Sequence, residues 1–404
     1  MRKKIFDIQS SMTPAGNAAY RLSMAMRKHG IDSKVLNLRP SSVRDFAYMD
    51  LKHKGGLFGK GVDHFYRALQ KKYMVEGAYF YSSIPFCGID IAQNQLVKEA
   101  DVIYIHWVAG EFSNDNLEKL AKTGKPIFFF MHDMWPFTGG CHHSLGCEKY
   151  SVNCKNCKMF NWNNPFPSYQ LQKKEYVYSK YSNIHFISPS KWMAGCAKMS
   201  FTMRNKTIYN IPNVIDEDVF KPIEKKVARM ILNLPIDATI ITFGCIAGQG
   251  NPFKGWSYLE SAINKTNIDN ALIVVYGSGY NQETVDKVKY PIKFLGRVYD
   301  DIMLSLISNV GDVFVTPSLC ENYSLTILES ILCGTPVVGF DTTGVPELVK
   351  TGETGYLAKF KNSDDLAKGI EQMIDAKLKK GEWENYSSNK IIDQHLSLIH
   401  KYLD

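Results

Sequence analysis

Two glutamates eight positions apart, Glu321 and Glu329, lie in a segment whose residue types suit ligand binding. An apolar run that predicts a strand precedes the segment, and the residues after Ser324 have the pattern of a helix that Gly334 and Pro336 end. We expect Ser324 to cap this helix and its first N–H groups to attract an anion. The two carboxylates would lie about 10 Å apart, which suits the two ends of an elongated ligand. The alternative is a solvated helix with two incidental glutamates.

Two further loops have residues suited to phosphate binding. Lys254, within Phe253-Lys254-Gly255, follows a predicted strand, where a cation can neutralise a diphosphate. Gly16 and Asn17 lie between the first predicted strand and its helix, where a glycine lets the backbone approach a phosphate. A plain turn is the alternative for this glycine.

A histidine follows another predicted strand. His132 comes directly after the apolar run 126–131, so we expect it to reach a ligand at the end of that strand. His106, at the end of the preceding strand, is a weaker candidate. The alternative for either ring is a hydrogen-bonded residue of the core.

Four of the nine cysteines crowd into seventeen residues: Cys141, Cys147, Cys154 and Cys157. The two residues between the last two cysteines are typical of a zinc knuckle, and His142 or His143 could replace one thiolate. A structural zinc site, disulfides and free thiols all remain open. A catalytic metal is not expected, because four protein thiolates leave no open coordination position.

Short apolar runs alternate with amphipathic stretches along the whole chain, which predicts βαβ units and parallel sheets. The pattern restarts after a junction near residue 212, rich in turn formers. We therefore expect an α/β protein with two doubly wound domains that face each other across a cleft. Residues 1–212 would form the first domain and 213–388 the second, and a terminal helix, 389–404, would cross back to the first domain.

Charge divides unevenly between these halves. Residues 1–212 carry 29 Lys and Arg against 15 Asp and Glu, and residues 213–404 carry 19 against 25, so their net charges are +14 and −6. A basic half suits nucleic acid, an anionic membrane face or a phosphorylated ligand, or merely confers solubility. Basic and aromatic residues in segment 44–86 suit either interfacial docking or a packed insertion. No apolar run is long enough to span a membrane, and no secretory leader is expected.

The glutamate segment, the following Gly334-Thr335-Pro336-Val337 and Thr343-Gly344-Val345-Pro346-Glu347 resemble the retaining glycosyltransferases of family 4, which have the two-domain GT-B architecture. The resemblance implies that Glu321 contacts the transferred sugar, that Glu329 holds the ribose and that Lys254 binds the diphosphate. It further implies an active-site role for His132 and for the glycine loop at Gly16. The family's usual arginine before the lysine is missing, so Arg297 is a candidate substitute. We expect the remaining donor contacts from Val298, Asn322, Tyr323, Ser324, Leu325 and Thr326, with Asn17 beside the glycine loop.

Without a secretory leader, we expect a cytoplasmic enzyme. The resemblance implies that the first domain binds the acceptor, often at the inner face of the membrane, and that the second binds the nucleotide sugar. The enzyme would transfer a sugar from a UDP-sugar or GDP-sugar to a glycan or lipid-linked glycan in surface polysaccharide synthesis, with no metal needed for catalysis. Phosphorolysis and sugar-nucleotide epimerisation are the alternative chemistries. Nucleic-acid binding is a weaker alternative, because the best motifs lie in the acidic half and no nucleic-acid-binding signature is present.

Overall fold

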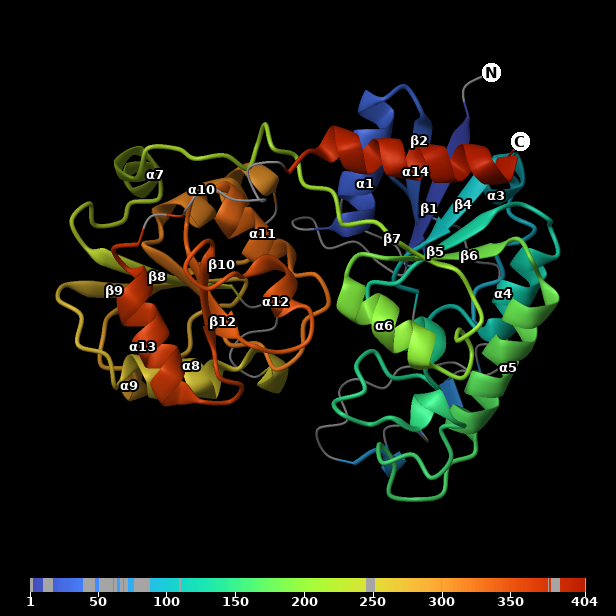
Figure 1. The fold of residues 1–404 in the computed structure, drawn as a ribbon, viewed down its shortest axis with the longest axis horizontal. Coiled ribbons are helices and arrows are strands. Elements are labelled where there is room, and N and C mark those ends of the chain that lie inside the picture. The colour runs from blue at the N-terminus through green and yellow to red at the C-terminus, as the bar shows by residue number, and fades with distance from the viewer. Residues whose placement is uncertain are drawn as a thin grey trace. The chain divides into compact units, whose positions relative to one another are not determined.

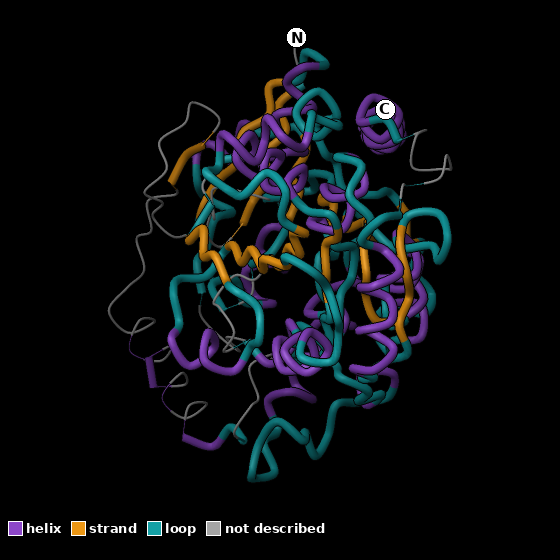
Figure 2. The backbone as a smooth tube through the Cα atoms, turned by 90° about the vertical axis from the view of Figure 1, so that its left-hand side faces the viewer, coloured by secondary structure: helices purple, strands orange, loops and turns teal. Residues whose placement is uncertain are grey.

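A computed structural model describes residues 3–9, 17–38, 48–50, 61, 64, 65, 68, 72–75, 88–108, 110–244, 251–298, 300–376, 378 and 386–403. Gly16 and most of segment 44–86 lie outside these residues. The chain separates into two compact units, and helices and strands alternate along both (Figure 1; Figure 2). Unit 1 comprises Met1–Met12, Ala18–Pro212 and Asn389–Asp404, and unit 2 comprises Thr13–Asn17 and Asn213–Ser388.

Unit 1 is built on a parallel sheet whose strand order among the described residues is β3-β2-β1-β4-β5-β6-β7. Its strands are β1 (Lys4–Gln9), β2 (Asp32–Asn37), β3 (Tyr48–Asp50), β4 (Val102–Ile105), β5 (Ile127–Phe130), β6 (Ile184–Ser188) and β7 (Ile208–Asn210). Its helices are α1 (Ala18–Lys28), α3 (Gln95–Glu99), α4 (Asn114–Ala121), α5 (Phe166–Lys180), α6 (Lys191–Met199) and α14 (Ser388–Leu403), with the 3-10 turns η1 (Trp135–Phe137) and η2 (Lys149–Ser151). The central strands are buried along their length, as expected of a parallel sheet covered on both faces.

The last helix of the chain, α14, packs on the sheet of unit 1, across its strands (Figure 1, red). The hydroxyl of Tyr104 on β4 lies 3.1 Å from Nδ1 of His395, and Tyr402 stacks on His185 of β6 with ring centroids 3.6 Å apart. Tyr402 also shares a hydrogen bond of 2.7 Å with Tyr209 of β7. Aromatic side chains of three strands therefore form the surface on which the C-terminal helix rests.

Unit 2 repeats the arrangement with the strand order β10-β9-β8-β11-β12-β13, again all parallel. Its strands are β8 (Thr239–Gly244), β9 (Ala271–Tyr276), β10 (Ile292–Gly296), β11 (Val313–Thr316), β12 (Val337–Phe340) and β13 (Gly355–Ala358). Its helices are α7 (Lys225–Ile231), α8 (Trp256–Ile263), α9 (Gln282–Lys287), α10 (Asp301–Val310), α11 (Leu325–Leu332), α12 (Val345–Leu348) and α13 (Ser363–Met373), with the 3-10 turn η3 (Pro252–Lys254). Both sheets have the doubly wound order, in which the direction of strand addition reverses beside the first strand, between β1 and β4 and between β8 and β11. The predicted α/β class with two doubly wound sheets is confirmed.

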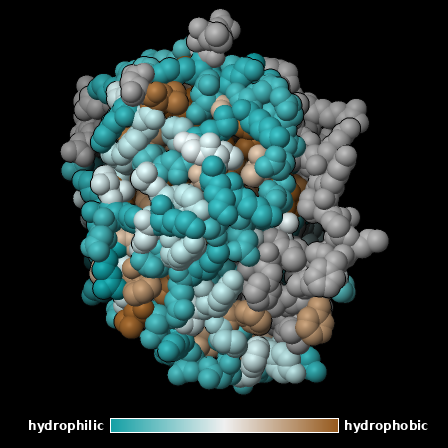
Figure 3. All heavy atoms as spheres, turned by 90° about the vertical axis from the view of Figure 1, so that its right-hand side faces the viewer, coloured by the Kyte–Doolittle hydropathy of each residue, from teal (hydrophilic) through white to brown (hydrophobic). Residues whose placement is uncertain are grey.

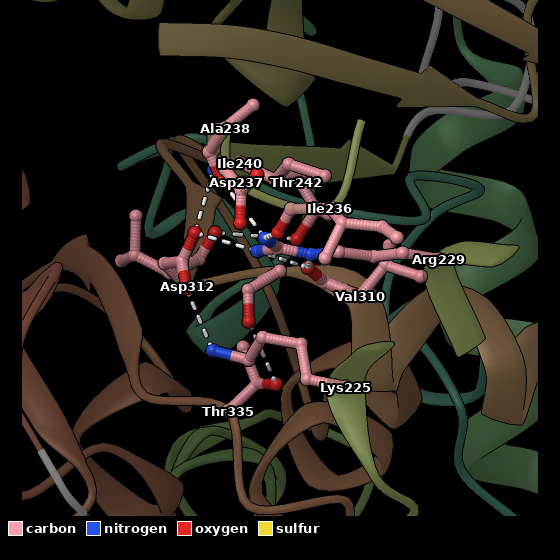
Figure 4. Close-up of polar contacts among 12 residues, drawn as sticks. Lys225, Arg229, Ile236, Asp237, Ala238, Ile240, Thr242, Val310, Asp312 and Thr335 are labelled. Carbon is pink, nitrogen blue, oxygen red and sulfur yellow. Dashed lines mark hydrogen bonds and ion pairs between the residues drawn. The ribbon is translucent and has the colours of Figure 1, made fainter. Parts of the chain in front are cut away.

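A buried arginine links α7 to the segments that lead into β8 and β11, the two central strands of the second sheet (Figure 4). The guanidinium of Arg229, 4% exposed, donates to Oδ2 of Asp312 at 2.8 Å and to the carbonyl oxygens of Ile236, Ala238 and Val310. Asp312 also accepts from Lys225, whose Nζ lies 2.7 Å from Oδ1 on the more exposed side. One carboxylate thus carries a buried and an exposed ion pair.

The two ion pairs of Asp312 predict unequal effects on stability. Arg229→Ala should lower the free energy of unfolding of unit 2 by about 3–5 kcal/mol, because it removes the buried half of the Asp312 ion pair and the donor of three carbonyl groups. Lys225→Ala, the matched control on the same carboxylate, should cost about 1 kcal/mol or less. Urea denaturation with hydrogen exchange on peptides of β8 and β11 measures both. Equal, small losses would contradict a stabilising role for the guanidinium.

The surface of unit 1 in Figure 3 is mostly hydrophilic, with small separate hydrophobic patches. Within the described ranges, no helix combines the length and the apolar character that crossing a bilayer requires.

Candidate functional site

The lysine and the first glutamate singled out in the sequence form an ion pair in unit 2. Lys254 lies in η3, after β8, and Glu321 lies in the loop after β11. Lys254 Nζ is 2.5 Å from Glu321 Oε1, a charge-assisted hydrogen bond. The lysine side chain is 34% exposed and the glutamate side chain 14%, so the pair lies at the surface. The two loops leave the sheet on either side of its reversal point, where ligands bind in doubly wound sheets.

Close backbone contact holds the lysine loop against the glutamate loop. Gly255 has φ of +70°, and a Cβ at this position would lie 1.9 Å from the carbonyl oxygen of Pro317. The Leu319 N–H donates to the carbonyl oxygen of Phe253 at 2.8 Å. Only glycine fits both the conformation and the contact, so Gly255 fixes where Lys254 lies.

A second loop fixes Glu321 from the other side. The Glu321 N–H donates to Oγ1 of Thr343 at 2.9 Å, and the Gly344 N–H donates to the carbonyl oxygen of Glu321 at 2.9 Å. A Cβ on Gly344 would lie 1.6 Å from the carbonyl oxygen of Asn322. The backbone around the glutamate is therefore held by three segments that are distant in sequence.

The second glutamate, Glu329, lies inside α11 and is 1% exposed. Burial raises the pKa of Tyr276, at the end of β9, well above its usual value, and the charge of Glu329 adds to this shift. Ser324 is the N-cap residue of this helix, as predicted, but its side chain caps no helix N–H, and its hydroxyl lies 3.1 Å from Oγ1 of Thr326.

Some of the other residues predicted to contact the donor lie at the start of α11, and the rest lie elsewhere in the chain. Asn322 and Ser324 are buried, and Leu325 and Thr326 are half-buried at the start of α11. Burial, with the charge of Glu347, raises the pKa of Tyr323. The remaining candidates lie elsewhere in the chain: Arg297 is exposed and Val298 half-buried just after β10, Asn17 precedes α1, and Gly16 lies outside the described residues.

A hydrogen-bonded chain of three side chains lies in unit 1. His132 Nε2 is 2.7 Å from His106 Nδ1, and His106 Nε2 is 3.0 Å from Asp7 Oδ1. Asp7 is fully buried on β1, His106 is 4% exposed at the end of β4, and His132 is half-buried at the end of β5. Ser33 of β2 donates to Oδ2 of Asp7 at 2.9 Å. The chain spans the reversal point of the first sheet, as the Lys254–Glu321 pair does in the second.

Burial is the largest cause of the pKa shifts of Asp7, His106 and His132. It raises the pKa of Asp7 to about 8, against the lowering effect of the Ser33 and Ser23 hydroxyls. Burial lowers the pKa of His106 to about 3 and that of His132 to about 3, the latter with a contribution from His106. Both imidazoles are therefore neutral at pH 7.

Sequence reasoning selected His132 but ranked His106 lower and did not select Asp7. The signal for Asp7 was a carboxylate inside an otherwise apolar strand, since a buried carboxylate needs a partner. His106, the weaker candidate, is the residue that joins the other two.

The four clustered cysteines are half-buried and form no disulfide. Burial raises the pKa of Cys141 well above its usual value, with further increases from the other three thiols, and raises the pKa of Cys154 to about 11. Beside them Lys174 is fully buried, donates to the carbonyl oxygen of Thr138 at 2.8 Å, and has its pKa lowered by burial to about 7. In the part of the chain that the structure describes, no three His, Cys, Asp or Glu side chains are arranged to hold a metal ion. The zinc site stays a prediction from the sequence.

Metal analysis tests that prediction. If the knuckle holds zinc, the purified chain carries about one zinc, Cys157→Ser loses it, and Cys196→Ser, a buried thiol outside the cluster, retains it. If the thiols are free, the protein is metal-free, and alkylation of Cys154 accelerates only toward pH 11, where the thiolate forms. A metal-free protein with four reactive thiols would make the zinc prediction wrong.

Part of unit 2 is similar in sequence to known glycosyltransferases. Residues 242–390 match the family model of the glycosyl transferases group 1. An uncharacterized glycosyltransferase of Methanocaldococcus jannaschii is 29% identical over 210 residues, which cover 48% of this chain and 53% of that protein. A D-inositol 3-phosphate glycosyltransferase of Mycobacterium leprae is 29% identical over 170 residues, which cover 40% and 39%. The chain thus spans about half or less of the length of these relatives.

Solved structures extend the likeness to both units. Sucrose-phosphate synthase from Thermosynechococcus elongatus has a TM-score of 0.67 at 17% identity and covers 99% of both chains. HepE of Anabaena, in complex with UDP and glucose, has a TM-score of 0.65 at 16% identity and covers 99% of this chain and 100% of that one. The protein has the GT-B fold, and the family match covers residues 242–390 of unit 2.

Proposed function

We propose that the protein is a retaining glycosyltransferase of family 4 that transfers a sugar from a nucleotide diphosphate sugar. The observation that carries the proposal is the contact between Lys254 and Glu321. In such a donor the diphosphate is bonded directly to the transferred sugar. A group that binds the diphosphate and a group that binds the sugar must therefore be neighbours. Lys254 Nζ and Glu321 Oε1 are neighbours, 2.5 Å apart.

In this proposal each unit 2 residue has a distinct role. Lys254, with the N–H groups at the start of α11, stabilises the negative charge of the departing diphosphate. Glu321 positions the transferred sugar. Its contact with Lys254 weakens when the donor binds, and its carboxylate accepts hydrogen bonds from sugar hydroxyls instead. Glu329, farther along the helix, holds the ribose. Donor binding thus separates the ion pair: Lys254 gains a new ion pair with the diphosphate, and Glu321 gains hydrogen bonds from the sugar.

His132 is proposed to act on the sugar or the acceptor hydroxyl. Because its ring is neutral at pH 7, it accepts or donates a hydrogen bond without bringing a positive charge to the site. The acceptor attacks the sugar from the face that the diphosphate leaves, which retains the configuration.

The donor class is supported by HepE, which binds UDP and glucose in its solved complex. We propose a UDP-sugar or GDP-sugar as donor and a glycan or lipid-linked glycan as acceptor, in surface polysaccharide synthesis. The +14 net charge of residues 1–212 suits an anionic acceptor or peripheral contact with the inner face of the membrane from the cytoplasm.

The test is direct incubation with UDP-sugars and GDP-sugars and a panel of glycan acceptors. NMR of the product should show that the anomeric configuration of the donor is kept. An inverted product would contradict the retaining mechanism. An epimerised donor without acceptor, or a sugar phosphate formed from a glycan and phosphate, would favour the alternative chemistries.

The proposed roles predict three different binding defects in unit 2. Glu329→Gln should weaken nucleoside diphosphate and nucleotide-sugar binding equally, by one to two decades, since a hydrogen bond to a charged group contributes about 1.5–3 kcal/mol. Glu321→Gln should leave nucleotide binding nearly unchanged and lower turnover. Lys254→Ala should weaken nucleoside diphosphate more than monophosphate binding, because it leaves Glu321 facing the phosphates. Calorimetry and turnover measure these effects.

The Lys254 effect has an internal check. Adding Glu321→Gln to Lys254→Ala should restore part of the diphosphate affinity, because it removes the repelling carboxylate. Lys265→Ala is the matched control, since Lys265 also pairs with a carboxylate of unit 2 at 2.5 Å. Loss of nucleotide binding in Glu321→Gln, with none in Glu329→Gln, would contradict the assigned roles.

A further inference from the structure

The hydrogen-bonded chain Asp7–His106–His132 restricts where its protons can lie. Each short contact needs one hydrogen between its two atoms, and a neutral imidazole has one N–H to place. The 2.7 Å contact joins two ring nitrogens, so one ring donates and the other accepts. The tautomers of the two histidines are therefore linked.

An ionised Asp7 allows a single arrangement. Its Oδ1 accepts from Nε2–H of His106, so Nδ1 of His106 carries a lone pair and accepts from Nε2–H of His132. Nδ1 of His132 then also carries a lone pair and accepts a hydrogen bond.

A protonated Asp7 reverses every bond. Ser33 donates to Oδ2, so the proton lies on Oδ1 and is donated to Nε2 of His106. His106 then donates from Nδ1 to His132, which carries its own proton on Nδ1 and donates outward.

We propose that Asp7 and His106 are positioning residues that set, through their hydrogen bonds, whether Nδ1 of His132 accepts or donates. When Nδ1 of His132 gives its proton to a water molecule or another acceptor beside the ring, the His106 Nδ1 proton moves to Nε2 of His132 and the Asp7 proton moves to Nε2 of His106. The negative charge then lies on Asp7, and the positive charge has left with the released proton. A fully buried carboxylate thereby exchanges a proton at a half-buried ring without being exposed itself.

The surroundings keep both rings neutral while this happens. Burial holds both histidine pKa values near 3 and raises that of Asp7 to about 8, so the carboxylate is the group that titrates near neutral pH. Other titratable groups act electrostatically on these three side chains, among them Tyr104 of β4, His395 of α14 and Asp133, whose carboxylate binds His142. The pKa of His395 is lowered to about 3 and that of Tyr104 is raised well above 10, so both stay neutral across this range.

A small cavity of about 10 Å³ borders His106 and His132, with Trp107 and Phe130 in its wall. Its size admits at most about one water molecule. Phe130 also stacks on His132 with ring centroids 4.7 Å apart, which keeps the ring in one orientation. The geometry therefore favours a change of tautomer over a movement of the ring.

NMR of the full chain labelled with ¹⁵N-histidine tests the proposal, with His106→Gln and His132→Gln to assign the signals. Both rings should be Nε2–H tautomers at high pH and Nδ1–H tautomers at low pH, with one shared midpoint near the pKa of Asp7. Asp7→Asn should abolish this transition. Asp101→Asn, an exposed carboxylate that binds the Lys4 N–H, should keep it.

A second variant covers the case that Asp7→Asn does not fold. Ser33→Ala removes a donor to the charged carboxylate and should move the shared midpoint up by about 1–2 pH units. Separate midpoints, formation of imidazolium at neutral pH, or an unchanged transition in the folded Asp7 or Ser33 variants would overturn the proposal.

The catalytic consequence rests on the proposed glycosyl transfer. The pH profile of sugar transfer should have the same midpoint as the tautomer transition, and Asp7→Asn should remove this pH dependence. If the tautomers switch but no sugar is transferred, the proposed function fails and the role of Asp7 stands. If transfer occurs but the tautomers do not switch, the role of Asp7 fails alone.

Discussion

Burial of the central strands on both faces is the constraint that organises each unit. A parallel sheet covered by helices has no solvated face, so polar side chains lie at the strand ends or bind one another. In unit 2 the polar side chains lie at strand ends, with Lys254 and Glu321 in loops after β8 and β11. In unit 1 buried polar side chains bind one another, with Asp7 inside β1 bound to Ser33 and His106. Both polar groups lie where the strand order reverses.

The charged pair of unit 2 owes its geometry to backbone contacts. Loops at strand ends bury few apolar side chains, so something else must fix their conformation. Here Gly255 and Gly344 let three segments approach within distances that a Cβ would forbid. Peptide hydrogen bonds from Leu319 and Gly344 then hold the segments together. The charges can be presented at the surface because the backbone beneath them is held rigidly.

The polar chain of unit 1 depends instead on exclusion of water. Tyr104 of β4 and Phe130 of β5 stack against His106, and α14 adds His395, which packs on both of these rings from the far end of the sequence. Desolvation keeps both imidazoles neutral and raises the pKa of the Asp7 carboxylate to about 8. Asp7 is therefore the group that gains or loses charge near neutral pH. The C-terminal residues therefore contribute to the environment of residues at the start of the chain.

The sequence by itself determined the fold class, most strand positions, the terminal helix and the Lys254, Glu321 and Glu329 segments, because apolar runs, helical spacing and turn residues are local signals. It missed β3, β7 and β13, which have only three or four residues each, too few for a clear pattern. It placed Ser324 correctly at the N-cap, but the expected side-chain cap is not formed. Asp7 and His106 are 99 residues apart, and only the pairing of β1 with β4 brings them together. Local patterns report burial, but which buried polar groups meet is decided by strand order and register, which exist only in the tertiary structure.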